Sequence, residues 1–401
     1  MKSYDIVIVG GGMVGAALAC ALAKTDYKVA VLEAFEFAAD QSPSFDDRSV
    51  ALSYGSRLLM QDMGLWASVQ EHAQHIAEIQ ISERKRLGLS RMHAQEEGVE
   101  ALGYVIENRR LGAVFQQCIA DKLDWIAPAK VREVKSRADG VLLRYDFQGQ
   151  EAMLQAKLLV AADGANSFVR RCLAIAAQTT DYGLSAIIAN VQTQLPHQGV
   201  AYERFTPTGP LAMLPLQPFA KQSRSSLVMT VKHGEVDRLM TLSDADFLKE
   251  VQGRFGQRLG RLRKIGQRAA YPVALVQAEK TTAPHSVIIG NAAQSLNPVA
   301  GQGFNLALRD VAALLDVLQG EHRIGSAAFI GAYKASRVAD RQNTIRFTDG
   351  LVKVFSNAIT PLAHLRAGSL MAADLIEPLR QRLVRQGMGL NAQRRIKGGT
   401  R

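Results

Sequence analysis

A cluster of glycines near the N-terminus constrains the fold of this chain more than any other feature. Gly10, Gly12 and Gly15 form the pattern Gly-x-Gly-x-x-Gly. β-Branched residues precede the pattern over residues 6–9, and an alanine-rich stretch follows it over residues 13–23. A buried strand that turns tightly into a helix explains these features together, because glycines permit both the turn and close packing of helix on strand.

The same region is an uncharged, mostly apolar run of 18 residues, 6–23, which is also typical of a signal peptide or a membrane span. Asp5 directly precedes this run, and glycines interrupt it. A signal peptide explains only the hydrophobicity. With a second predicted strand over residues 28–32, the segment predicts a βαβ unit of a parallel sheet.

Glu33 stands 23 positions after Gly10, at the end of the second predicted strand. A carboxylate at this place can accept hydrogen bonds from the ribose hydroxyls of an adenosine, and it would repel a 2′-phosphate. The N-terminus of the helix after the glycines offers free N–H groups to a pyrophosphate. The sequence therefore predicts tightly bound FAD or NAD rather than NADP, with a glycine-rich turn that binds nothing as the alternative. The predicted contacts are Gly10, Gly12, Met13, Val14, Gly15 and Glu33.

Two later segments also place a polar, glycine-containing turn after a buried strand. The first carries Asp163 and Gly164, both predicted cofactor contacts, after a predicted strand over residues 158–161. The second follows a predicted strand over residues 286–290 and precedes a predicted helix over residues 304–318. Glycines admit close approach of a ligand to the backbone, and the positive end of the helix suits an anionic reduced flavin. The second segment supplies the predicted cofactor contacts Gly290, Asn291, Gly301, Gly303, Phe304 and Asn305.

The length of 401 residues accommodates two domains. Alternating strands over about 178–276, interrupted by an amphipathic helix over residues 244–255, indicate an antiparallel sheet. We therefore predict an α/β protein with a Rossmann-like FAD domain on a parallel sheet and a smaller substrate domain on an antiparallel sheet. The predicted boundaries are 1–177 for the first part of the FAD domain with insertions near 75–105, 178–280 for the substrate domain, 281–320 for the second part of the FAD domain, and 321–401 for a helical, basic C-terminal region.

The net charge of +11 is concentrated in that C-terminal region. Residues 331–401 contain 13 Lys and Arg against 4 Asp and Glu, a net charge of +9. Over residues 351–390, basic side chains accompany apolar stripes, a pattern that lets a helix lie on an anionic membrane surface. A helix packed on the core or at a subunit contact fits the pattern equally well. Nucleic acid is not an expected partner, because no aromatic platform is interleaved with the charges.

The cysteines and histidines argue against a metal centre. The three cysteines form no CxxC pair, and the eight histidines form no HExxH motif. Such cysteine usage is typical of a reducing compartment. We therefore expect a cytoplasmic protein, and the basic tail adds peripheral attachment to the inner membrane as an option.

The three motifs, in this order, resemble the single-component FAD-dependent aromatic hydroxylases of the para-hydroxybenzoate hydroxylase type. The resemblance extends over about residues 5–318, and the tail fits more loosely. Residues 44–52, Ser-Phe-Asp-Asp-Arg-Ser-Val-Ala-Leu, resemble a loop of that family whose arginine lies near the FAD pyrophosphate, which implies this role for Arg48.

A narrower resemblance is to the ubiquinone-biosynthesis branch, and within it to the 2-polyprenyl-6-methoxyphenol hydroxylases. It rests on Phe45-Asp46-x-Arg48, Arg204-Phe205-Thr206, Gly209-Pro210-Leu211-Ala212-Met213-Leu214-Pro215, Gly290-Asn291-Ala292-Ala293-Gln294 and Ala300-Gly301-Gln302-Gly303-Phe304-Asn305-Leu306.

Two positions depart from the wider family. Asn291 and Gln294 stand where the family usually has Asp and His, so Asn291 can bond a ribityl hydroxyl without bringing a charge. Asn108 stands where the family often has Arg at a helix start, which makes it a predicted flavin contact, with Arg109 as the competing candidate.

The resemblance implies a monooxygenase. NADPH or NADH would reduce FAD and leave, and O2 would form a flavin C4a-hydroperoxide that hydroxylates a polyprenylated phenol. A separate nicotinamide domain is not expected, since no second Gly-x-Gly-x-x-Gly occurs. Pro298, Gly301, Gln302 and Gly303 should border the flavin ring. We identify no catalytic base, because Tyr202, Glu203, Arg204 and His233 of the presumed substrate sheet all fit ordinary surface or cross-strand positions.

Other functions stay open at this point. A hydroxylase of another aromatic substrate fits the same motifs. A plain NAD-dependent dehydrogenase would leave the two later motifs without a role. A halogenase or polyprenyl reductase would carry tryptophan signatures that are not found, since the chain has only Trp66 and Trp125. A non-catalytic flavin-binding scaffold, in a complex with other ubiquinone-biosynthesis proteins, would explain Asn291 and Gln294 as signs of decay.

Overall fold

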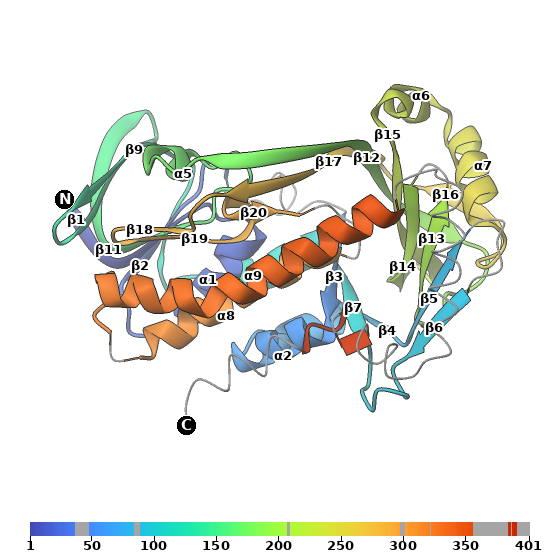
Figure 1. Cartoon of the computed structure of the whole chain (residues 1–401), viewed down its shortest axis with the longest axis horizontal. Helices are drawn as coiled ribbons and strands as arrows, with labels where there is room; N and C mark the ends of the chain where they lie inside the picture. Colours follow the sequence, from blue (N-terminus) through green and yellow to red (C-terminus); the bar gives the residue numbers. More distant parts are fainter. Residues whose placement is uncertain are drawn as a thin grey trace.

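The computed structural model describes residues 1–36, 48–83, 89–206, 209–296, 301–320, 322–355, 384–385 and 387–390, with the backbone alone over 351–355. Two large sheets lie toward opposite ends of the molecule, and the long helix α9, Ala327–Phe355, runs between them (Figure 1). This arrangement confirms the predicted α/β class with one sheet that contains parallel strands and one that is largely antiparallel.

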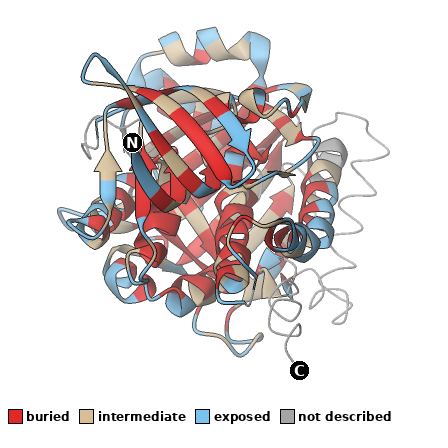
Figure 2. Ribbon diagram, turned by 90° about the vertical axis from the view of Figure 1, so that its left-hand side faces the viewer, coloured by how far each residue is buried: buried red, intermediate tan, exposed pale blue. Residues whose placement is uncertain are grey.

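The first sheet is built on parallel strands in the order β19, β11, β1, β2 and β8. Its central strands are buried on both faces, as the continuous β-branched run of β1 requires. Helices α1, α4 and α8 pack on one of these faces around a shared hydrophobic core. Figure 2 looks at the molecule from this end and shows the buried residues concentrated in the strands and on the inward sides of the helices. The elements are β1 Lys2–Val9, α1 Met13–Leu22, β2 Val29–Leu32, α4 Asn108–Ile119, β8 Asp124–Ile126, β9 Ala129–Arg137, β10 Gly140–Phe147, β11 Gln150–Ala161, α5 Phe168–Cys172, β18 Thr282–Ala283, β19 Ser286–Ile288, η3 Gly290–Ala292 and α8 Gln302–Leu318.

Strand β11 differs from the prediction. The pattern of apolar residues in the sequence predicts two separate strands here, one over 152–154 and the one over 158–161 described above, but the structure has one strand that changes partner along its length. Its first half pairs antiparallel with β10, and its second half pairs parallel with β1 and β19. The polar residues between the two predicted strands lie where these two sets of pairs meet.

The second sheet has nine strands and carries helices α6 and α7 on one face. It includes β5 and β6, which come from the segment near residues 75–105, and β5 pairs parallel with β13. The elements are β5 Glu78–Glu83, β6 Leu89–His93, β12 Ala177–Thr193, β13 Val200–Thr206, β14 Gly209–Phe219, β15 Gln222–Lys232, η2 His233–Glu235, α6 Val236–Thr241, α7 Asp244–Phe255, β16 Leu262–Ile265, β17 Ala269–Ala278 and β20 Gln294–Ser295.

A small three-stranded sheet lies between the two large ones. Its strands β3 and β4 both pair with β7, and it packs on β14 of the second sheet. The described C-terminal residues Val384 and Met388 are buried in the same cluster. None of the helices in the described parts of the chain is long and apolar enough to cross a membrane. The remaining elements are β3 Ser49–Ser53, α2 Tyr54–Asp62, α3 Trp66–Val69, η1 Gln70–His72, β4 Gln74–Ile76 and β7 Gly103–Glu107.

Candidate flavin-binding site

The N-terminal glycines form a turn that leaves no room for side chains. Gly10 has a φ of +101°, and a Cβ added there would lie 2.5 Å from the carbonyl oxygen of Ala162. A Cβ at Gly15 would lie 1.9 Å from the carbonyl oxygen of Gly10. Gly12 caps the start of α1 without a side-chain hydrogen bond to the free N–H groups. The turn therefore presents bare backbone and the positive end of a ten-residue helix, which fits a pyrophosphate.

Glu33 lies at the end of β2 beside this turn. Its carboxylate accepts hydrogen bonds from the backbone N–H groups of Gly11 and Phe35, the latter at 3.0 Å. The side chain is only partly exposed. A carboxylate held at this edge of the sheet, next to the glycine turn, fits the ribose end of an adenine dinucleotide.

The second motif is tied to the third by Arg170. Asp163 accepts hydrogen bonds from the hydroxyl of Ser167 at 2.5 Å and from the N–H of Val169 at 3.0 Å, so its carboxylate organises its own loop. Buried Arg170 donates to the carbonyl oxygen of Ala292 at 2.8 Å. Gly164, with a φ of +83°, has no atom within 4 Å of an added Cβ, so its backbone conformation rather than packing requires glycine.

Asp310 in the middle of α8 anchors the third motif from behind. One carboxylate oxygen accepts hydrogen bonds from the backbone N–H of Gly290 at 3.2 Å and from the Gln294 side chain at 3.0 Å. The other accepts from Arg337 at 2.8 Å and from Arg341 at 3.3 Å, both on α9. Gln294 therefore faces the interior, whereas Asn291 is exposed on the other side of the turn.

This charge cluster is almost completely buried. Asp310 is 0% and Arg337 1% exposed. Burial alone would raise the pKa of Asp310, but the charges of Arg337 and Arg341 outweigh it and lower the pKa below its ordinary value. None of the sequence motifs predicted this cluster, although the Arg-Asp pair at 309–310 within an otherwise apolar helix was a signal for it.

The N-terminus of α8 lies against β3. Gly301 adopts a left-handed conformation with a φ of +58°, and a Cβ there would lie 3.1 Å from that of Ala51. Asn305 holds the two elements together: it accepts from the N–H of Ser53 at 2.9 Å and donates to the carbonyl oxygens of Ala51 and Gly301 at 2.9 and 2.8 Å. An added Cβ at Gly303 would meet no atom within 4 Å, so packing within the chain places no demand there.

The other predicted contacts near α8 lie at different depths. Gln302 and Phe304 are buried, and Phe304 belongs to the hydrophobic core. Met13 and Val14 are partly exposed at the start of α1, and Val14 lies 3.0 Å from a Cβ added at Gly290. The glycines of the first and third motifs therefore lie side by side. Pro298, Phe45, Asp46 and most of the C-terminal basic stripe lie outside the described residues.

One face of the second sheet carries α7, and we call the opposite face the inner face. Three contacts hold the inner face against the FAD side of the molecule. The Arg48 guanidinium lies 4.7 Å from the ring centre of Tyr271 on β17. Arg224 on β15 forms two hydrogen bonds of 3.0 Å with Glu107, which directly precedes α4. The third contact joins Ala201 and Leu216 of the inner face to the small sheet.

Of the two competing flavin contacts at the start of α4, Asn108 is buried at the first position of the helix, whereas Arg109 is exposed.

The four candidate bases of the second domain lie in different places: three alternate along β13, and His233 begins η2. Tyr202 packs edge-on against Phe255 of α7, with ring centres 5.5 Å apart, and Arg204 approaches the same helix at Gly256. His233 bonds Ser185 at 2.7 Å and Asp181 at 3.1 Å. Glu203 lies between Tyr202 and Arg204 in β13, so its side chain is on the inner face.

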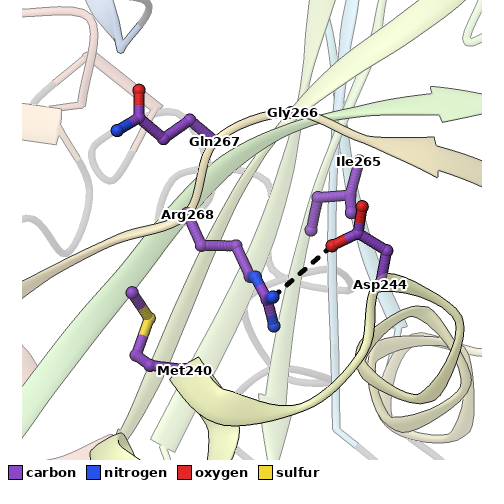
Figure 3. A pocket seen from close by; sticks show the side chains of 6 residues that line it. All are labelled: Met240, Asp244, Ile265, Gly266, Gln267 and Arg268. Atoms are coloured by element: carbon purple, nitrogen blue, oxygen red, sulfur yellow. Dashed lines mark ion pairs between the residues drawn. The ribbon is translucent and has the colours of Figure 1, made fainter.

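A surface hollow of about 420 Å³ lies elsewhere, between α6, α7 and the loop before β17. Figure 3 shows Arg268 and Asp244 facing each other across it, and their ion pair measures 3.4 Å. Arg268 also donates to the carbonyl oxygens of Leu239 and Leu242 at 3.1 and 2.8 Å. Its charge is therefore used to join α6, α7 and the sheet, on the side away from the glycine turns (Figure 1).

The fold and the glycine turns together define a flavin-dependent oxidoreductase. A family model described as FAD binding domain matches residues 3–348. The chain belongs to this family, and it is an FAD-dependent monooxygenase of the aromatic hydroxylase type.

Relatives in other organisms narrow the comparison. The ubiquinone hydroxylase UbiL of Rhodospirillum rubrum is 35% identical over 97% of this chain and 90% of its own length. The 3-demethoxyubiquinol 3-hydroxylase of Escherichia coli is 32% identical over 96% of this chain and 98% of its own length. Among solved structures, p-nitrophenol 4-monooxygenase of Pseudomonas putida superposes with a TM-score of 0.79 over 97% of this chain and 99% of its own, at 17% identity, which shows the shared fold. The chain thus falls within the ubiquinone-biosynthesis branch of the FAD-dependent hydroxylases.

Proposed function

We propose that this protein hydroxylates a polyprenylated phenol in ubiquinone biosynthesis, with FAD as bound cofactor and NADPH or NADH as transient reductant. The narrower proposal is an activity like that of the 2-polyprenyl-6-methoxyphenol hydroxylases. The observation that carries the proposal is the similarity to two ubiquinone hydroxylases over at least 96% of this chain. The FAD-binding turns supply the physical basis.

The chain offers a group for each part of FAD. The Gly10–Gly15 turn and the start of α1 would hold the pyrophosphate, with Arg48 nearby, and Glu33 would hold the ribose. Asp163, Gly290, Asn291 and Asn108 would contact the ribityl chain or the flavin, and the segment from Pro298 to Asn305 would border the ring. Bound FAD would supply electron transfer from the nicotinamide and the activation of O2.

The inner face suits an apolar aromatic substrate. Ile188, Val228, Leu214 and Ile81 are partly exposed on this face although they lie within strands. Their side chains, together with the small sheet opposite, would bind a phenol ring and the first part of a prenyl chain. An environment of low polarity would also exclude water from the reacting ring.

The decisive experiment measures oxidation of NADPH by the FAD-loaded protein with and without candidate phenols, and the mass of the product. We expect prenylated methoxyphenols to accelerate the oxidation and to gain one oxygen atom. Oxidation stimulated equally by simple phenols without a prenyl chain would favour a hydroxylase of another aromatic substrate. Oxidation that no phenol stimulates, without any oxygenated product, would exclude the proposal.

Membrane contact through the basic tail and membership of a biosynthetic complex are further parts of the proposal. Described residues Val384 and Met388 of this tail pack in the core, so they are not free for membrane contact. Deletion of the residues after Gly350 should reduce binding to anionic liposomes if the rest of the tail carries the contact. Unchanged binding would remove the tail from the proposal.

A further inference from the structure

Glu203 occupies the centre of an otherwise uncharged row on the inner face. Strand pairing places it beside Ala212 of β14 on one side and Ile81 of β5 on the other. The row continues from Ala212 to Val228 and Ile188, and from Ile81 to Ser90. Within the described chain, no side chain forms a hydrogen bond or ion pair with the Glu203 carboxylate. A carboxylate without partners in such a row lowers the stability of the fold. Its presence therefore indicates a role other than stabilisation.

The row faces the FAD side of the protein. Tyr271, which contacts Arg48, pairs with Ala186, and Ala186 lies two residues from Ile188 on the same face. Ala201 lies two residues before Glu203 on the same face of β13 and packs on the small sheet. That sheet includes β3, which Asn305 holds against the start of α8. Glu203 thus lies on a surface bounded by the elements that we expect to hold the flavin.

We propose that Glu203 is the catalytic base that accepts the proton of the phenol. This inference rests on the proposed function, because it requires a phenolic substrate on the inner face. The O–H bond of the phenol breaks, its proton passes to a carboxylate oxygen of Glu203, and its electron pair stays on the phenolate. The phenolate donates electron density to the ring carbons, which become better nucleophiles toward activated oxygen, and no electron leaves or enters in this step.

The environment of Glu203 suits this role. Burial raises its pKa from 4.5 to about 7, although the residue is not fully buried. An ordinary carboxylate is a weaker base than a phenolate by about six pKa units, or about 10⁶-fold. The raised pKa lessens the mismatch to about 10³-fold, which a bound phenol can overcome more readily.

Other ionisable groups also face the row and must be tested against Glu203. Glu83 is the nearest rival, because its residue pairs with Phe205 on the same face. The others on this face or opposite it are Arg224 on β15, Tyr271 on β17, Glu107 before α4 and Tyr54 on α2.

The test compares phenols that differ in acidity. The FAD-loaded enzyme oxidises NADPH at pH 7 with 2-geranyl-6-methoxyphenol or with a ring-fluorinated analogue, whose hydroxyl ionises more readily. We expect the loss of kcat/KM in Glu203→Gln to be large with the first phenol and much smaller with the second, which depends less on a base. Glu203→Asp should restore part of the activity, and Glu78→Gln should match the wild type. Glu78 is the matched control because it lies on the neighbouring strand with its side chain on the opposite face.

The kinetics should change in the same sense. For the wild type kcat/KM should rise with pH through about 7, the pKa of Glu203. In Glu203→Gln it should fall by about 10²-fold or more at pH 7, mainly through kcat, and should rise only as the phenol itself ionises. FAD absorbance and circular dichroism should match the wild type, because glutamine has nearly the same shape.

Unchanged kcat/KM in Glu203→Gln, an equal loss with both phenols, or a selective loss in Glu83→Gln alone would overturn the assignment. Failure of the proposed function has a different signature. In that case the wild type would oxidise NADPH no faster with either phenol and would transfer no oxygen to it.

Discussion

Asp310 and Glu203 are both carboxylates inside the protein, but their surroundings differ in charge. Asp310 accepts hydrogen bonds from two arginines and two neutral donors, and its pKa is lowered. Glu203 lies among uncharged side chains, and burial raises its pKa to about 7. The first arrangement stabilises one geometry behind the Gly290 turn, and the second keeps a proton acceptor near neutrality. Charged neighbours therefore distinguish a structural carboxylate from a reactive one.

The largest expected effect is that of Asp310→Asn. Arg341 would lose its ion pair with Asp310 and Arg337 would keep only its ion pair with Asp340, and breaking such a buried pair typically costs about 3–5 kcal/mol of unfolding free energy. The N–H of Gly290 would also lose a charged acceptor, so FAD affinity should fall. Urea denaturation and FAD titration measure both effects. Asp316→Asn, at an exposed position of the same helix, is the control and should change stability by less than about 0.5 kcal/mol.

The parts of the fold that were predicted correctly depend on local patterns. The β-branched run before Gly10 became β1, and the helix predicted over 244–255 is α7 with the same bounds. Periodicity and capping are read from neighbouring residues, so one sequence suffices for them. Pairing is not local: the sequence did not show that β5 joins β13 in the second sheet, or that β11 changes partner midway.

The same distinction holds for the site. Glycine motifs announce a ligand because the backbone itself is the binding group. The Asp310 cluster needed the packing of α9 on α8, and the direction of Glu203 needed the register of β13. Sequence alone therefore left Tyr202, Glu203 and Arg204 equivalent, whereas the structure places only Glu203 on the inner face.

Glu203→Gln should alter stability in the opposite direction to Asp310→Asn. Because the pKa of Glu203 is raised in the folded protein, its contribution to stability is present below about pH 4.5 and is lost as the pH rises to about 7. Above pH 7 the free energy of unfolding of the variant should exceed that of the wild type by up to about 3 kcal/mol. Water that reaches the partly exposed side chain makes this difference smaller. Unfolding curves between pH 4 and pH 9 check this trend. A wild type that gains stability relative to the variant as the pH rises would mean that the carboxylate is paired, and the contrast with Asp310 would disappear.

Arg224→Lys tests an intermediate case, a half-buried ion pair that joins the two regions. Lysine cannot reproduce the two parallel hydrogen bonds to Glu107, so we expect a loss of about 1 kcal/mol. Glu107 directly precedes Asn108, a predicted flavin contact. We therefore expect kcat to fall by more than the loss of folded protein explains. Arg132→Lys is the matched control, since its pair with Asp146 is 53% and 38% exposed and should contribute almost nothing. Equal effects of the two substitutions on kcat would show that the Arg224 pair has no bearing on the flavin site.

Gly303→Ala should have the smallest effect on stability. This substitution tests whether the start of α8 contacts the cofactor. An added Cβ meets no atom of the chain within 4 Å, and alanine favours a helix over glycine by up to about 0.5–1 kcal/mol. Stability of the cofactor-free protein should therefore rise slightly, while FAD affinity, measured by quenching of flavin fluorescence, should fall by about 10-fold or more. Gly331→Ala is matched to it, because that glycine lies within α9 and also has open space around its Cβ. The control should gain stability without any change in FAD affinity. If both variants keep full affinity, the glycine at 303 does not serve close approach of FAD, and the flavin ring must lie nearer Gly301 and β3 than we propose.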